Sequence, residues 1–150
     1  MATLQAFDLT RQAPRSPRAR LGGFAILPRM LDKGRATIVH KSGEYNFDCP
    51  LDNQFLSYVG LKGSEILPQL EGGLTNWEML EWILANARNK RTEAEILTWS
   101  SVQDNRGPGD IESQQYFTQT LAKLAPHRKD ISTWFHLLDL DDYVSFGGRA

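Results

Sequence analysis

The basic residues near the N-terminus are the first in this sequence whose types and spacing could do chemistry. Arg29, Lys33 and His40 follow one another at intervals of four and seven residues, which places them on nearly the same face of a helix. Arg35 lies elsewhere on that helix. An arginine offers a planar fork of donors and a lysine a point charge, so such a surface could bind phosphate or carboxylate.

Three further arginines extend this basic region towards the N-terminus: Arg15, Arg18 and Arg20. We expect the anionic group of a small molecule to be held by four side chains, Arg15, Arg29, Lys33 and Arg35. The alternative is internal pairing, in which Arg29 and Lys33 meet acids of the remaining chain, or Asp32 pairs with Arg35.

Cys49 is the only cysteine and a candidate nucleophile. A reactive thiolate needs an electropositive, partly exposed site, which the basic helix could supply, and His40 is nine residues upstream as a possible base. The catalytic candidates bordering the anion site are Tyr45, Cys49 and Asp52. Their alternatives are structural: Cys49 as a small buried hydrophobe and Asp52 as a helix cap.

Other kinds of site have less support in the sequence. The histidines share no short ligand spacing (His40, His127 and His136), so neither a metal site nor a cofactor is predicted. A pI near 6.3 and the lack of an aromatic-interleaved basic stripe argue against a nucleic-acid partner. The tyrosines and four tryptophans could line a pocket between helices or simply pack the core.

Charge is distributed unevenly along the chain. Residues 1–41 carry a net charge of +6, and the remainder carries −7. The basic segment could pack on the acidic body, or it could meet an acidic partner. The second function class is therefore a noncatalytic protein-interaction domain that binds an acidic partner or a second copy of itself, which leaves a homo-oligomer open.

The elements that must position these side chains are predicted to be helical. We expect one all-α domain over residues 1–150 with five to seven helices, an N-terminal arm at 1–13 and a loose tail at 147–150. The alternation at 44–49 allows one short extended segment. Ser16 and Pro17 favour a short helix before Gly22, and the spacing of Leu27, Leu31 and Ile38 predicts a helix from Pro28 to about Lys41.

Capping signals predict the later helices. A helix holding Phe55 to Val59 follows Asp52. Gly63 or Ser64 opens a brief turn through Leu67, because Pro68 argues against a long helix there. Thr75 and Thr92 each begin a capping box, Asp110 caps a helix through Ala125, and the last helix starts at Asp130 or Ser132. The core-facing residues expected on the two capping-box helices are Trp77, Leu80, Ile83, Leu84, Ile96, Leu97, Trp99 and Val102.

The cellular setting follows from what the sequence lacks. One cysteine excludes an intrachain disulfide, the N-terminus has no signal-peptide core, and no segment approaches the roughly 20 apolar residues of a bilayer span. We expect a soluble, cytoplasmic protein without a membrane partner.

Several segments resemble the uncharacterised bacterial family called domain of unknown function 5069. They are Asp8 to Thr10, Pro14 to Arg18, Leu27 to Ala36, Gly43 to Tyr45, Cys49 to Asp52 and the ending from Trp134 to Tyr143. The similarity covers nearly the whole chain, and its N-terminal half is the more specific part. The resemblance implies a stand-alone cytoplasmic domain of this length and carries over no activity or ligand.

Overall fold

Seven α-helices and no strand make up the regular structure of residues 4–150, the part of the chain that the computed structural model describes. The helices are α1 (Leu27–Ile38), α2 (Pro50–Val59), α3 (Gly63–Glu71), α4 (Asn76–Asn86), α5 (Glu93–Asn105), α6 (Ile111–Leu124) and α7 (Trp134–Ser145). This confirms the all-α class at the upper end of the expected helix number. None of these helices is long and apolar enough to cross a membrane.

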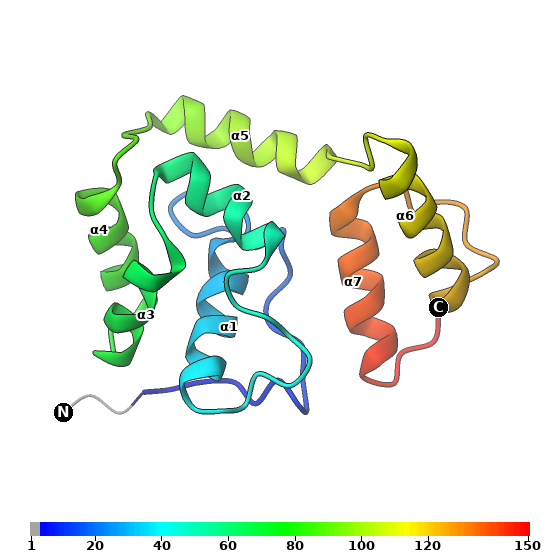
Figure 1. Ribbon diagram of the computed structural model, residues 1–150, viewed down its shortest axis with the longest axis horizontal. Coiled ribbons are helices and arrows are strands. Elements are labelled where there is room, and N and C mark those ends of the chain that lie inside the picture. The colour runs from blue at the N-terminus through cyan, green and yellow to red at the C-terminus, as the bar shows by residue number, and fades with distance from the viewer. Residues whose placement is uncertain (1–3) are drawn as a thin grey trace.

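The seven helices form two groups joined by α5 (Figure 1). The first four helices lie together, with α1 packed against α3 and α2. Helix α5 runs along one side of the molecule and leads to an α6–α7 hairpin, in which α7 contacts both α5 and α6. The hairpin shares the main core, because the fully buried Phe135 of α7 belongs to the same apolar cluster as Phe24 and Phe55.

Helix α1 is the central element, and all of its residues from Leu27 to Ala36 are buried. Close packing against α3 depends on Gly34, where an added Cβ would lie 2.6 Å from Leu70 Cδ1. Because even one extra methyl group is felt in a close-packed interior, a larger residue here would force the Leu70 side chain to move. The charged residues of this stretch of α1 are therefore buried as well. Which of them has a partner of opposite charge decides where a ligand could bind.

Side-chain caps place several helix starts where the sequence predicts them. The Thr75 and Thr92 hydroxyls accept hydrogen bonds from the third-residue amides of α4 and α5, and both capping boxes are complete. Asp110 caps α6 in the same way. The last helix begins slightly later than expected, because Thr133 is its cap rather than Asp130 or Ser132.

Helix α1 ends earlier than its predicted limit at Lys41. His40 adopts a left-handed φ of 59°, its amide donates to the Thr37 carbonyl, and the Lys41 amide donates to Ala36. This is the hydrogen-bond pattern of a Schellman ending, with a histidine in the place usually taken by glycine.

Two predicted local elements are wrong. The segment after Pro17 is a turn rather than a short helix, because the Ser16 hydroxyl bonds to Asp139 at 2.7 Å and the Pro17 carbonyl accepts from Ile26 at 2.9 Å. Residues 44–49 form two turns rather than an extended segment. Long-range polar contacts thus decide the path of both segments.

Pro68 does not limit α3 to a brief turn; it lies inside the helix. A proline removes one helical hydrogen bond and costs about 3 kcal/mol in a helix interior. Ile66 and Leu70 on either side of it are fully buried in the main core, and their burial offsets that cost.

The predicted apolar faces of α4 and α5 are partly wrong. Trp77, Leu84, Leu97 and Val102 are exposed by 47% to 66%, whereas Met79, Leu80 and Ile83 of α4 are buried. In α5 the buried residues are Ile96, Ser100 and Gln103. Both faces are rotated relative to the prediction, because packing partners and not periodicity alone select the buried side.

The N-terminal segment crosses the end of α1. Leu9 is buried, and its amide donates to the Lys41 carbonyl at 2.8 Å. Of the arm predicted at 1–13, residues 1–3 lie outside the described residues.

Candidate functional site

Four charged side chains of α1 are buried: Arg29, Asp32, Lys33 and Arg35 are exposed by 3%, 3%, 3% and 9%. Buried charges are rare in proteins unless they are paired. They leave α1 in two directions, and each set lines its own cavity. Arg29 and Lys33 line one, and Asp32 and Arg35 line the other.

Lys33 is at the centre of a buried polar cluster. Its Nζ lies 2.9 Å from Asp52 Oδ1 and donates to Cys49 Sγ at 3.2 Å and to the Asn46 carbonyl at 3.1 Å. Asp52 has no exposed surface and also accepts a hydrogen bond from the Asp48 amide at 2.8 Å. Burial raises the pKa of the Asp52 carboxyl, and the Lys33 ammonium acts in the opposite direction.

Asp52 is therefore not the cap of α2, as one interpretation of the sequence had it. Cys49 occupies the cap position without a side-chain capping bond, and Asp52 lies within the first turn. Its carboxylate is used internally, against Lys33 and the preceding loop.

Arg29 and Tyr45 meet at one carboxylate of α7. Arg29 Nη1 lies 2.7 Å from Asp142 Oδ2, and the Tyr45 hydroxyl donates to Asp142 Oδ1 at 2.7 Å. The Arg29 guanidinium also lies over the Tyr45 ring, 5.5 Å from its centroid. Burial, followed by the hydrogen bond to Asp142, raises the pKa of the Tyr45 hydroxyl. This cluster connects α1 and the following loop to the α6–α7 hairpin.

A cavity of about 980 Å³ lies between these clusters and α7, and we call it the α7 cavity. Four predicted site residues converge on it, namely Arg29, Lys33, Tyr45 and Cys49. Residues of the hairpin form part of its wall, among them Tyr116, Trp134, Leu138 and Asp141. Asp52 is not on the wall, because it lies behind Lys33.

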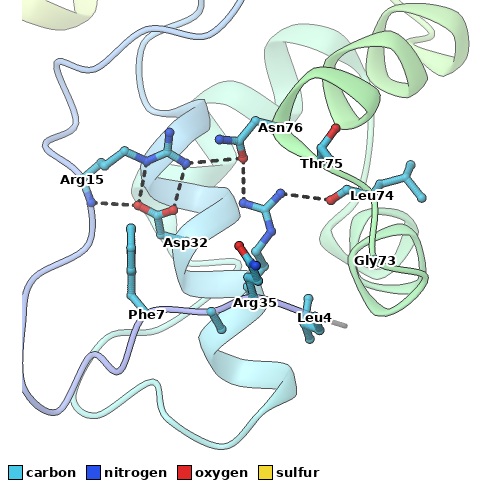
Figure 2. Close-up of a pocket in the computed structure, with 11 residues that line it drawn as sticks. Leu4, Phe7, Arg15, Asp32, Arg35, Gly73, Leu74, Thr75 and Asn76 are labelled. Atoms are coloured by element: carbon cyan, nitrogen blue, oxygen red, sulfur yellow. Dashed lines mark hydrogen bonds and ion pairs between the residues drawn. The ribbon is translucent and has the colours of Figure 1, made fainter. Parts of the chain in front are cut away.

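A second cavity, of about 700 Å³, is lined by the predicted residues Arg15 and Arg35, and we call it the Arg35 cavity. Figure 2 shows Arg15, Asp32 and Arg35 between the N-terminal segment, which contributes Leu4 and Phe7, and the start of α4. The expected single site of residues 14–52 is thus divided, since Arg15 and Arg35 do not share a cavity with Arg29 and Lys33.

Asp32 pairs with Arg15 and not with Arg35. The Arg15 Nε and Nη2 atoms each donate to an Asp32 oxygen at 2.9 Å, which is a bidentate contact. The Arg15 backbone amide also donates to Asp32 Oδ2 at 2.9 Å. Arg35 instead donates to Asn76 Oδ1 at 2.7 Å and to the Leu74 carbonyl at 3.2 Å. Within residues 4–150 no carboxylate forms an ion pair with Arg35, and burial lowers the pKa of its guanidinium.

Most of the basic N-terminal region is neutralised internally. Six of its cations form ion pairs: Arg11, Arg15, Arg18, Arg20, Arg29 and Lys33. Four of the carboxylates come from the acidic part of the chain, namely Asp52, Asp104, Asp139 and Asp142. The opposite charges of the two parts of the chain are therefore largely used in ion pairs within the molecule. Of the Lys and Arg residues in this region, Arg35 and Lys41 form no ion pair with a described residue.

Sequence reasoning missed three residues that complete these sites. Asn76 accepts hydrogen bonds from both Arg35 and Arg15, Asp142 joins Arg29 to Tyr45, and Arg106 lines the α7 cavity. Asn76 had a signal, since it is the first residue of a predicted helix and could present its side chain at that end. Asp142 belongs to the acidic part of the chain on which the basic segment was expected to pack, although its pairing with Arg29 was not predicted. Arg106 had no signal.

Comparison with known proteins supplies the relationship of the chain but no activity. No curated protein matches it significantly. Residues 11–144 match the family described as "Domain of unknown function (DUF5069)", which covers all seven helices except the last residue of α7. The chain therefore belongs to this family.

Proposed function

We propose that this protein binds a small anion, the carboxylate or phosphate group of a metabolite, in the Arg35 cavity. The observation that carries the proposal is a guanidinium that is 9% exposed and has no carboxylate partner among the described residues. Removing an unpaired charge from water is unfavourable, so a buried cation favours an anionic partner. The charged groups on the lining are Arg15, Arg35 and Asp32, which leave one positive charge uncompensated.

The start of α4 adds further donors. Thr75 and Asn76 line the cavity. The Met79 amide donates to the Thr75 carbonyl, and the Glu78 amide donates to the Thr75 hydroxyl. Asn76 and Trp77 are the first two residues of α4, and their amides are among those that a helix N-terminus leaves without an intrahelical partner. Such amides, together with the helix dipole, favour an anion at this end.

The lining of the Arg35 cavity favours recognition over catalysis. Among residues 4–150 the lining contains no Cys, His, Lys or Tyr, and its one carboxylate, Asp32, is held by Arg15. The Thr75 hydroxyl already serves as the cap of α4. A volume of about 700 Å³ lies within the usual range of roughly 300–1,000 Å³ for small-molecule pockets.

The proposal is tested by the stabilisation that an anion gives. Inorganic phosphate and succinate are titrated against the wild type and Arg35→Gln in urea unfolding, with sodium chloride at matched ionic strength as the reference. A ligand that binds only the folded state raises its stability with concentration. We expect a rise for the wild type with at least one anion and none for Arg35→Gln.

Arg11→Gln is the matched control, because it removes the same charge from the same N-terminal segment at a side chain that is 86% exposed and lies outside the cavity. It should keep the full rise. Each variant is compared with its own anion-free value, so a loss of stability from the substitution does not enter the result. Equal rises in Arg35→Gln and wild type would rule out this site.

The rival function, electrostatic binding of an acidic partner or a second copy, has weaker support. Its basic surface would need free cations, and most of those in residues 4–41 pair within the chain. This function stays a prediction. Because roughly 1 M salt screens interactions between exposed charges, association that persists unchanged at that concentration would contradict it.

A further inference from the structure

The α7 cavity runs along one whole face of α7. Trp134, Leu138, Asp141 and Ser145 line it at intervals of four, three and four residues, which is the spacing of a single helical face. At 1.5 Å per residue this face is about 16 Å long. The cavity is therefore elongated, and its two ends can be compared.

An unpaired cation lies at the end where α7 begins. Arg106 lines the cavity, and its backbone carbonyl accepts a hydrogen bond from the Trp134 amide at 3.0 Å. Its Nε is buried without a hydrogen-bond partner, and between Leu4 and Ala150 its side chain forms no ion pair. Burial lowers the pKa of Arg106, and no carboxylate acts against this effect.

Carboxylates predominate at the other end. Asp141 and Glu44 line the cavity there, next to Asp142. Asp142 pairs with Arg29, and among residues 4–150 neither Asp141 nor Glu44 forms an ion pair. Asp141 and Glu44 are exposed. The partial burial of the Asp141 carboxyl and the charges of Asp142 and Glu44 raise its pKa, whereas the Ser145 hydrogen bond and the charge of Arg29 act in the opposite direction. A positive group would relieve this repulsion.

The middle of the cavity carries no net charge. Lys33 is neutralised by Asp52 behind it, and the wall includes the apolar side chains Leu51 and Leu138 together with the amides Asn46 and Gln54. This combination suits a ligand whose centre has both apolar and hydrogen-bonding groups. Its ends should carry opposite charges.

From this arrangement we infer that the α7 cavity binds a short peptide with free termini, its carboxylate at Arg106 and its ammonium at Asp141 and Glu44. Seven helical residues separate Trp134 from Asp141, or about 10 Å. An extended peptide spans roughly 3.3–3.6 Å per residue, so about three residues fit. A volume of about 980 Å³ also leaves room for the side chains of a peptide. An unbranched amino acid of the same length would leave that room unfilled.

Trialanine and its two blocked analogues, N-acetyl-trialanine and trialanine amide, test this inference by isothermal titration calorimetry. Each analogue lacks one terminal charge at nearly unchanged size. Losing a hydrogen bond to a charged group reduces affinity about tenfold or more, so both analogues should bind correspondingly more weakly than trialanine. Cys49 locates the binding, because it lies on the cavity wall and is the only cysteine. Bound trialanine should slow its alkylation by iodoacetamide.

Two variants assign the ends. Arg106→Gln should weaken trialanine binding and abolish the preference over the amide, whereas Asp141→Asn should abolish the preference over the N-acetyl form. Arg128→Gln is the control, because Arg128 pairs with Asp130 outside the cavity and loses the same charge. Circular dichroism checks that each variant is folded.

The inference is overturned if trialanine does not bind, if either analogue binds equally well, or if Arg106→Gln behaves like Arg128→Gln. It is independent of the anion proposal, because Arg35→Gln should leave trialanine binding unchanged and Arg106→Gln should leave the phosphate effect unchanged. Failure of one proposal is therefore distinguishable from failure of the other.

Discussion

Removing the Lys33 ammonium should expose how far the interior depends on one ion pair. In Lys33→Met the side chain keeps a similar apolar length, but Asp52 is left without a cation in a position with no exposed surface. Cys49 and the Asn46 carbonyl lose a donor at the same time. Breaking a buried pair by removing one partner destabilises proteins by about 3–5 kcal/mol, and we expect a loss of that size at pH 7.

The loss should shrink in acid. Burial already raises the pKa of Asp52 in the folded state above its ordinary value of 3.8, and without Lys33 the pKa should rise further. The folded state then binds the Asp52 proton more tightly than the unfolded state. The corresponding stability is complete below 3.8 and is lost as pH rises through the folded-state pKa, so the variant is worst at neutral pH.

Urea unfolding followed by tryptophan fluorescence measures this difference at pH 7 and at about pH 4.5. Lys129→Met is the control, because Lys129 is exposed and forms no ion pair with a described residue. Lys33→Met with Asp52→Asn should recover part of the loss, since no buried charge remains. A deficit that is equal at the two pH values, or no larger than that of Lys129→Met, would refute the role given to the pair.

Three further substitutions test other contacts by the same unfolding measurement. Asp142→Asn leaves the buried Arg29 without its carboxylate and should lower the free energy of unfolding by about 3–5 kcal/mol. A much smaller decrease would contradict the view that this pair holds α7 to α1. Gly34→Ala places a methyl group 2.6 Å from Leu70 Cδ1 and should cost about 1–3 kcal/mol, so a neutral result would mean that α3 yields easily. Thr92→Ala removes the α5 cap and should cost about 1 kcal/mol, a loss that Thr92→Ser should largely prevent.

Helix starts could be predicted well because their signals are local. Thr75 and Thr92 bond to amides three residues away, so the same short segment contains both the cap and its partner. Buried faces could not be predicted in the same way. Trp77 fits the apolar period of α4 yet is 64% exposed, because nothing in the described part of the chain covers that side.

The candidate site residues were predictable as types but not as groups. Basic residues on α1 were recognised from their spacing, and the division between Arg29 and Arg35 follows from their different directions on the helix. That acids of the remaining chain could pair with Arg29 was predictable, but the individual partners were not, since Asp142 lies 113 residues from Arg29 and Asn76 lies 41 from Arg35. Nothing in the local sequence links such distant positions.

The sequence by itself determined the all-α class, most helix starts and the concentration of basic residues between Arg11 and Lys41, because these depend on composition and on contacts within a few residues. Only the tertiary structure decided which charges are neutralised. Chain folding brings Asp52 to Lys33 and Asp142 to Arg29. Arg35 and Arg106 line two separate cavities and have no ion-pair partner among residues 4–150. An ion pair depends on distance in space, and that distance is set by the packing of whole helices.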